Sequence, residues 1–133
     1  MYTEGGLGKS IAATAVCHAI KKAYPERELI VVSPWATIFD GLDCVYKCVY
    51  PNVEYFYYDY IEGKDSIVFA QDPYRTTEYI NGKHLIQSWI ESIGLTYDGE
   101  EPSIKFDALT LNAGNAQWAQ YGTRPYMVLQ TNG

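Results

Sequence analysis

The sequence has 133 residues, of which 47% are hydrophobic and 20% are charged. This composition is typical of a folded domain rather than a disordered chain, and a domain of this size can bury most of its apolar surface. The formal net charge is −6, with only 10 lysines and arginines, which argues against a nucleic-acid partner because binding a phosphate backbone needs clustered basic side chains. No apolar run approaches the roughly 20 residues of a membrane span.

The N-terminus runs into glycines without an apolar stretch, so no signal peptide is predicted and the expected location is cytoplasmic. Three cysteines, Cys17, Cys44 and Cys48, form no C-x-x-C pair. We expect them to be reduced structural thiols. No metal site is predicted, because only His18 and His84 are left to complete a zinc ligand set.

The first 33 residues predict a glycine turn, a helix and a buried strand. Apolar residues recur at helical spacing from Ile11 to Ala23, and Pro25 stops the helix. The residues expected on its other, polar side are Ser10, Thr14, Cys17 and Lys21. Residues 28–33 are nearly continuously apolar, which is typical of a parallel strand covered on both faces. This order matches the latter part of a βαβ unit.

The later elements continue an alternation of helices and strands. In chain order we expect a short helix over 35–39, a strand over 43–50, a connection over 51–64, a strand over 65–70, a helical region over 77–93, a short strand over 103–106, a weaker helix over 108–119 and a last strand over 125–129. Gly94 suits the position after the end of the helical region. The pattern predicts an α/β fold, a Rossmann-like three-layer αβα sandwich with a mostly parallel sheet.

The domain organisation follows from the two ends of the sequence. Residues 1–123 are expected to form an N-terminal Rossmann-like lobe, and residues 124–133 the start of a second lobe or a final strand. Little chain precedes the glycine turn, and the tail resembles the opening of another unit, so we expect a fragment of a longer protein. The alternative is a small, complete domain with a short first strand.

The glycine turn is the motif best suited to chemistry. It comprises Gly5, Gly6, Leu7, Gly8, Lys9 and Ser10. Glycines permit a tight turn and close backbone approach, and unpaired amides at a helix start favour a phosphate or carboxylate. We expect those amides to be the ones of Lys9, Ser10 and Ile11, with the Lys9 charge and the Ser10 hydroxyl as further contacts. The structural alternatives are tight helix packing by the glycines, capping by Ser10 and a solvated Lys9.

A P-loop is a weaker match to the same residues. The pattern G-x-x-x-x-G-K-[ST] requires a glycine where Thr3 stands, and the partition-ATPase variant requires a lysine where Glu4 stands. A nucleotide hydrolase also needs an acidic Mg²⁺ ligand after a buried strand, yet residues 28–33 are followed by no carboxylate until Asp40. A deviant P-loop domain that binds nucleotide with Mg²⁺ therefore remains the alternative.

Three segments together resemble heptosyltransferase-like glycosyltransferases of the GT-B fold. "EGGLGKSIAATAVCHAIKKAYPERELIVVSPWATIFDG" is similar to their opening, in which a G-G-x-G-[D/K/N] turn starts a helix that ends in K-x-x-Y-P before an I-x-V-V-x strand. "AQDPYRTTEYINGKHLIQSWIESIGLTYDGEEP" resembles the segment that ends in G-[LI]-x-Y-D-G-x-x-P. "RPYMVLQTNG" is similar to the first strand of the second lobe. The shared order of these weak motifs carries the resemblance.

The resemblance implies a function in sugar transfer. These enzymes move a sugar from a nucleotide-sugar donor to an acceptor in the cleft between two Rossmann-like lobes. The first lobe mainly holds the acceptor and supplies the glycine turn. The implied partners are a nucleotide-sugar, a sugar or glycan acceptor and the missing C-terminal lobe, with no further cofactor. The chain alone is therefore expected to be inactive, and a non-catalytic lobe that binds a sugar or a partner is a further alternative.

The resemblance also bears on single residues. Many members carry an Asp after the glycines, proposed as the general base, and here that position is Lys9. A protonated lysine cannot accept a proton, but it can neutralise charge on a departing diphosphate. The candidate catalytic residues are therefore Lys9 and Asp72, with Arg75 as a binding residue and Trp35 as a ring that stacks on a sugar. For Asp72 and Arg75 the alternative is a capping loop with a surface ion pair.

Overall fold

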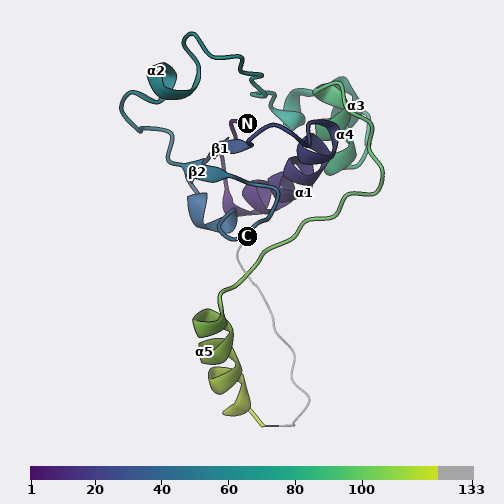
Figure 1. The fold of residues 1–133 in the computed structure, drawn as a ribbon. Coiled ribbons are helices and arrows are strands. Elements are labelled where there is room, and N and C mark those ends of the chain that lie inside the picture. Colours follow the sequence, from purple (N-terminus) through teal and green to yellow (C-terminus); the bar gives the residue numbers. More distant parts are fainter. Residues whose placement is uncertain (123–133) are drawn as a thin grey trace.

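The structure is a computed structural model that describes residues 1–122, and its fold is α/β (Figure 1). The elements in chain order are α1 (Leu7–Ala23), β1 (Ile30–Val32), the 3₁₀ helix η1 (Ala36–Ile38), β2 (Lys47–Val49), α2 (Phe56–Tyr60), the 3₁₀ helix η2 (Pro73–Arg75), α3 (Thr77–Ile80), α4 (Leu85–Ser92) and α5 (Ala108–Ala119). The helices predicted over 35–39 and 108–119 are confirmed.

A small parallel sheet of β1 and β2 lies at the centre of the fold. Residues 1–3 run beside β1 without forming a named strand: Tyr2 makes a parallel bridge to Val32, and the Thr3 N–H donates to the Val32 carbonyl at 2.9 Å. On the other side, the Tyr2 N–H donates to the Phe69 carbonyl at 2.7 Å. The backbone order across the molecule is therefore β2, β1, residues 1–3 and the segment at Phe69.

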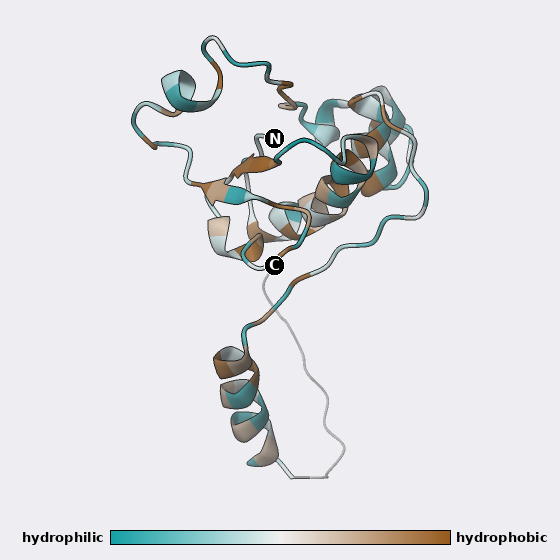
Figure 2. Ribbon diagram, in the orientation of Figure 1, coloured by the Kyte–Doolittle hydropathy of each residue, from teal (hydrophilic) through white to brown (hydrophobic). Residues whose placement is uncertain are grey.

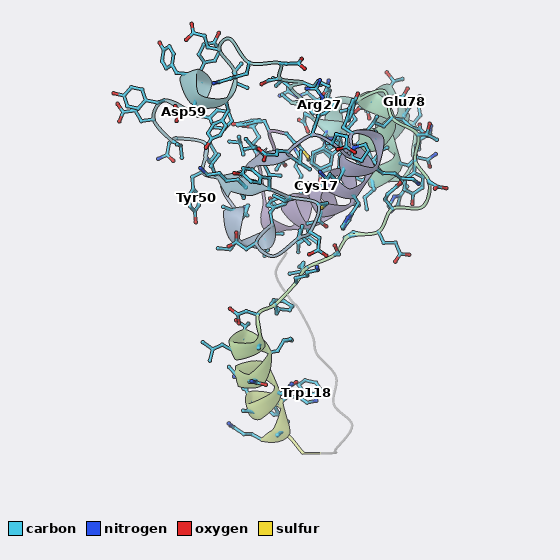
Figure 3. The ribbon with its side chains drawn as sticks, viewed as in Figure 1. Cys17, Arg27, Tyr50, Asp59, Glu78 and Trp118 are labelled. Carbon is cyan, nitrogen blue, oxygen red and sulfur yellow. The ribbon has the colours of Figure 1, made fainter. Side chains whose placement is uncertain are left out.

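Helix α1 is buried on more than one side, so the expected polar side is wrong for most of its members. Ser10, Thr14 and Cys17 are each 0% exposed, and Cys17 lies among the side chains of the interior in Figure 3. The reason is that α4 packs against α1 in addition to the sheet. A helix enclosed in this way needs small residues rather than one apolar stripe, and alanines supply them.

The core joins α1, the sheet and α4. Its buried members are Ala12, Ala13, Ala15, Val16, Cys17, Ala19, Ile20, Leu29, Val31, Phe39, Leu42, Cys44, Phe69, Ile86, Trp89 and Ile90. Figure 2 shows the apolar residues of β1 and of the facing helices gathered at this centre. Burial of α1 against α4 fixes the start of α1 relative to the carboxyl end of β1.

The strands are shorter or fewer than the sequence predicts. Those expected over 28–33 and 43–50 are reduced to three residues each, and residues 65–70 and 103–106 form none. Next to residues 1–3, only the bond to Phe69 forms, and Ile67 and Val68 remain exposed. In the second segment, the Ser103 N–H donates to the Thr14 side chain instead of to a neighbouring strand.

The helical region expected over 77–93 is divided into α3 and α4. The break falls at Gly82, whose φ of +90° no α-helix accommodates. The side-chain oxygen of Thr76 caps α3 by accepting from the Tyr79 N–H at 3.3 Å. Apolar residues recur at helical spacing on both sides of the break, which is why the sequence predicts one helix.

Gly94 occupies the predicted position after the end of α4. Its φ is +79°, its N–H donates to the Glu91 carbonyl at 3.0 Å, and the Leu95 N–H donates to the Ile90 carbonyl at 3.2 Å. These two bonds form a Schellman motif, which satisfies carbonyls at the end of α4. The prediction of Gly94 as the C′ residue is confirmed.

Helix α5 stands apart from the rest of the described chain (Figure 1). All of its residues are exposed, including Leu109, Leu111 and Trp118. The three-layer sandwich is thus not formed in full, since the described helices that pack on the core are α1 and α4. The expected strand over 125–129 and the expected second-lobe start at 124–133 lie outside the described residues. Across residues 1–122, every helix is too short or too polar to cross a bilayer.

Replacing Gly94 by Ala tests the Schellman motif. An L-residue in the left-handed region costs roughly 1–2 kcal/mol, so G94A is expected to lower the free energy of unfolding by about that amount. Urea denaturation followed by circular dichroism measures it. The matched control is G114A, because Gly114 lies inside α5 without a positive φ and a Cβ there meets open space. Equal stability of G94A and wild type would contradict the assignment.

Candidate functional site

The glycine turn joins residues 1–3 to α1. Gly5 has a φ of +104°, and Gly6 is the N-cap of α1 without a side-chain capping bond. The first i to i−4 bond of α1 runs from the Ser10 N–H to the Gly6 carbonyl at 3.2 Å. The amides ahead of this bond are those of Leu7, Gly8 and Lys9, which lie outside the helical ladder. Residues 4–8 are all exposed.

This register corrects the expected set of free amides. The sequence places them at Lys9, Ser10 and Ile11, but α1 begins at Leu7, so the Ser10 amide is already bonded and Ile11 follows it in the ladder. The helix can begin at Leu7 because neither Gly6 nor Gly8 has a positive φ. Three amides are still presented at an exposed helix start, two residues earlier than expected.

Ser10 faces the interior. It is 0% exposed, and its hydroxyl lies 3.4 Å from that of Ser33, the residue after β1. The Ser33 hydroxyl also accepts from the Trp35 N–H at 3.1 Å. These contacts connect α1 to the carboxyl end of β1. Contact of the Ser10 hydroxyl with a ligand stays a prediction.

Lys9 is held between an acid and two aromatic rings. Its Nζ donates to Asp72 Oδ1 at 2.9 Å, and the lysine side chain is only 9% exposed. The same Nζ lies 5.4 Å from the centroid of the Tyr74 ring and 5.6 Å from that of Trp89. Rings at this distance attract a cation through their π faces. The charge of Lys9 is therefore largely met within the protein.

Asp72 has several partners. Besides Lys9, its Oδ1 accepts from the Tyr74 N–H at 3.3 Å, and its Oδ2 lies 3.4 Å from Arg75 Nε. Hydrogen bonding to Lys9 is the main cause that lowers the pKa of Asp72 below its ordinary value, with smaller contributions from Tyr74 and Arg75. Asp72 is therefore a carboxylate at neutral pH. A carboxylate stabilised in this way is a weak proton acceptor, which disfavours it as a general base.

Arg75 ends η2 beside this cluster. Its side chain is 88% exposed, so its guanidinium retains a large solvent-facing surface despite the contact with Asp72. The structure therefore brings three predicted residues together, Lys9, Asp72 and Arg75, next to the glycine turn. Within the cluster, Arg75 has the cationic group most accessible to a ligand.

Trp35 contacts the glycine turn directly. Its indole N–H donates to the Gly5 carbonyl at 3.0 Å, and the ring is 41% exposed. The sequence suggests this ring only as a surface for a sugar, and the hydrogen bond that holds the turn was missed. Trp35 comes two residues after Ser33, at the end of β1, and the ends of neighbouring parallel strands meet at one edge. That rule is the signal by which its position beside Gly5 can be anticipated.

The histidines and cysteines lie elsewhere in structural roles. His18 Nε2 lies 2.8 Å from the Ser103 hydroxyl, and His84 is the N-cap of α4. Burial raises the pKa of Cys17 well above its ordinary value and that of Cys48 to about 11. Thiols with raised pKa values are poor nucleophiles. Among residues 1–122, no cluster of His, Cys, Asp and Glu has the make-up of a metal site.

Comparison with known proteins found no matching family model, no matching curated protein and no matching solved structure. The function must therefore be argued from the site itself.

Replacing Asp72 by Asn tests the cluster. Loss of the charged partner of Lys9 is expected to lower the free energy of unfolding by about 1 kcal/mol at pH 7, allowing for solvent screening. Because the pKa of Asp72 is lowered in the folded state from the ordinary value of 3.8, this stabilisation is complete above that pH. It is lost as the pH falls through the folded-state pKa. Urea denaturation of both proteins at pH 7 and at pH 3 measures the difference.

The matched control is D98N. Asp98 also pairs with a lysine, Lys22, but both side chains are mostly exposed, at 71% and 62%, so its loss is expected to matter much less. A stability difference for D72N that is the same at pH 3 and pH 7 would contradict the ion pair.

Proposed function

We propose that this chain is the Rossmann-like first lobe of a GT-B glycosyltransferase-like protein and that its glycine turn binds the anionic group of a substrate. The observation that carries the proposal is the position of the turn. It presents the amides of Leu7, Gly8 and Lys9 where residues 1–3 leave the sheet, and all of residues 4–8 are exposed.

The order of the backbone-paired segments supports this reading. In chain order, residues 1–3, β1, β2 and the segment at Phe69 are first to fourth, and in space they follow the order third, second, first, fourth. This matches the first four positions of the Rossmann strand order 3-2-1-4-5-6. The order reverses between the first and fourth segments, and open α/β sheets bind ligands outside the carboxyl ends at such a reversal.

Two of the predicted site residues follow these two segments. The glycine turn comes directly after residues 1–3, and Asp72 comes three residues after Phe69. The ion pair between Lys9 and Asp72 joins them across the reversal. The residues singled out in the sequence therefore meet at the place where a ligand of such a sheet is expected.

The chemistry of the turn favours binding over proton transfer. An anion would be held by amide hydrogens and by the positive end of α1. Lys9 already neutralises Asp72, and Asp72 is a weak base, so neither meets the requirements of the proton acceptor. Arg75 supplies the exposed cation that would accompany a phosphate. We therefore infer a role in holding and orienting a diphosphate or a sugar acceptor, in the manner that the resemblance implies.

The P-loop alternative requires different features. Its lysine must reach the phosphates, yet Lys9 is paired with Asp72 and only 9% exposed. Its Mg²⁺ ligand must follow a buried strand, yet β1 is followed by Ser33 and Pro34. Nucleotide binding that depends on Mg²⁺ is the property that separates this alternative from the proposal.

Calorimetric titration with uridine diphosphate and adenosine diphosphate tests the proposal. Wild-type protein is expected to bind weakly, and equally well in EDTA and in Mg²⁺. The variant G8V is expected to bind at least about tenfold more weakly, equivalent to about 1.4 kcal/mol, because side-chain methyls would cover the amides. A Cβ on Gly8 meets no atom within 4 Å, so the variant is expected to fold.

The control for that titration is G114V, which places the same side chain in α5, again with no atom within 4 Å of the Cβ. Absence of diphosphate binding, or equal binding by G8V and wild type, would refute the role of the turn. Tight, Mg²⁺-dependent binding of ATP would favour the P-loop alternative.

Trp35 is expected to act by holding the turn. W35F retains a ring but removes the donor to the Gly5 carbonyl. Diphosphate affinity is therefore expected to fall by about threefold to tenfold, which corresponds to the net free energy of one hydrogen bond. W118F, the same change in the distant helix α5, is the control. An unchanged affinity of W35F in the same titration would show that the bond does not order the turn.

A further inference from the structure

A cavity of about 680 Å³ lies between the sheet and the segment that follows β2. Its floor includes Tyr2, Ile30 and Val32, and its roof includes Phe56, Tyr57 and Tyr60 of α2. In Figure 1 the chain carrying α2 arches away from the sheet, which shows how the space arises. This cavity shares none of its lining with Gly5, Lys9 or Asp72.

The floor of the cavity lies on the face of β1 opposite Val31, while Ile20, Leu29 and Phe69 of the core line its side. Along β1, Val31 is 0% exposed and belongs to the core with α1 and α4, whereas Ile30 and Val32 line the cavity. Alternate residues of a strand point to opposite faces. A parallel strand normally has both faces covered by apolar groups, and here the second face is roofed by α2 without being filled.

The walls are aromatic and aliphatic. Besides the residues of the floor and roof, the ring pair of Tyr24 and Phe69, with centroids 6.1 Å apart, closes one side. Tyrosine and phenylalanine rings bind other rings through stacked or edge contacts. The volume falls within the roughly 300–1,000 Å³ typical of small-molecule pockets, which are mainly apolar with a few polar groups.

The charges of the lining are mostly paired. Arg27 donates to the Asp65 carboxylate at 2.6 Å and to its backbone carbonyl at 2.7 Å. Figure 3 shows Arg27 at this part of the molecule. The other charged groups of the lining are Glu28, which would repel an anion, and the Met1 ammonium, which donates to the Ile30 carbonyl at 2.7 Å. Burial lowers the pKa of that ammonium. Both cations of the lining are thus already bonded within the protein, which favours a neutral ligand over a phosphate or carboxylate.

We propose that this cavity is a binding site for an uncharged, ring-bearing small molecule. Its shape and lining supply apolar burial and ring contacts, and its cationic groups already have partners within the protein. The proposal is independent of the function proposed for the glycine turn, because it involves other residues and no anion.

Fluorescence titration with N-phenyl-1-naphthylamine, a neutral fluorophore with aromatic rings, tests the proposal. Wild-type protein is expected to bind the probe saturably at one site. I30W, which fills the cavity from its floor, is expected to weaken binding by about tenfold or more. The matched control is I80W, because Ile80 is 71% exposed on α3 and outside the cavity, and it is expected to bind as wild type does.

A second variant makes the test independent of the folding of I30W. Tyr57 is 57% exposed on the roof, so Y57S is expected to fold and to weaken probe binding by about threefold or more. Absence of saturable binding by the wild type, or unchanged affinity in both I30W and Y57S, would overturn the proposal. A wild-type dimer in gel filtration that I30W dissociates would also overturn it, because a second copy would then cover the cavity.

Discussion

The enclosure of α1 between the sheet and α4 is the constraint on which the rest of the structure depends. Nine of its 17 residues are buried, and most of these are alanines or other small side chains. Small residues allow close approach of helix backbone to its neighbours, which a row of leucines would prevent. The start of α1 is thereby fixed beside the end of β1. The glycine turn, the Lys9 ion pair and the contact with Trp35 all follow from that placement.

The glycine turn and the cavity both arise from the small size of the sheet. At the carboxyl edge, residues 1–3 lead into exposed glycines, and the first amides of α1 lie outside the helical ladder. On the second face, short strands give the segment after β2 little to pair with, so it arches over apolar side chains instead of lying on them. A polar site and an apolar site therefore adjoin the same small sheet, the first at its carboxyl edge and the second on the face of Ile30 and Val32.

The sequence predicted local structure well where local signals decide it. The turn, the end of α1 before Pro25 and the cap at Gly94 depend on glycine, proline and helical spacing, and all three were found, although α1 begins earlier than expected. The edge strands were not, because pairing between Tyr2 and Phe69 joins residues far apart in the chain. Apolar runs show that a strand is favourable, but not whether a neighbour is present to bond it.

The same limit applies to the site. Lys9, Asp72 and Arg75 were each identified from their positions after predicted strands or turns, but their pairing spans 63 positions between Lys9 and Asp72. Spacing in the sequence gave no sign that the lysine would be neutralised by that acid. Nor did it show that Ser10 would face the interior. An Ala-rich helix with scattered hydroxyls has the pattern of an amphipathic helix, and the sequence does not reveal that α4 also packs on α1.

The exposure of helix α5 affects how the protein unfolds locally. It spans 12 residues, carries no charged side chain, contains Gly114 and has every residue exposed. Among residues 1–122, no other element packs on it, and a helix of that length with little packing is marginal in water. Its backbone amides are therefore expected to exchange with solvent deuterium through local fraying, whereas those of α1 exchange only when the whole core opens. The two helices thus belong to separate units of cooperativity within one short chain.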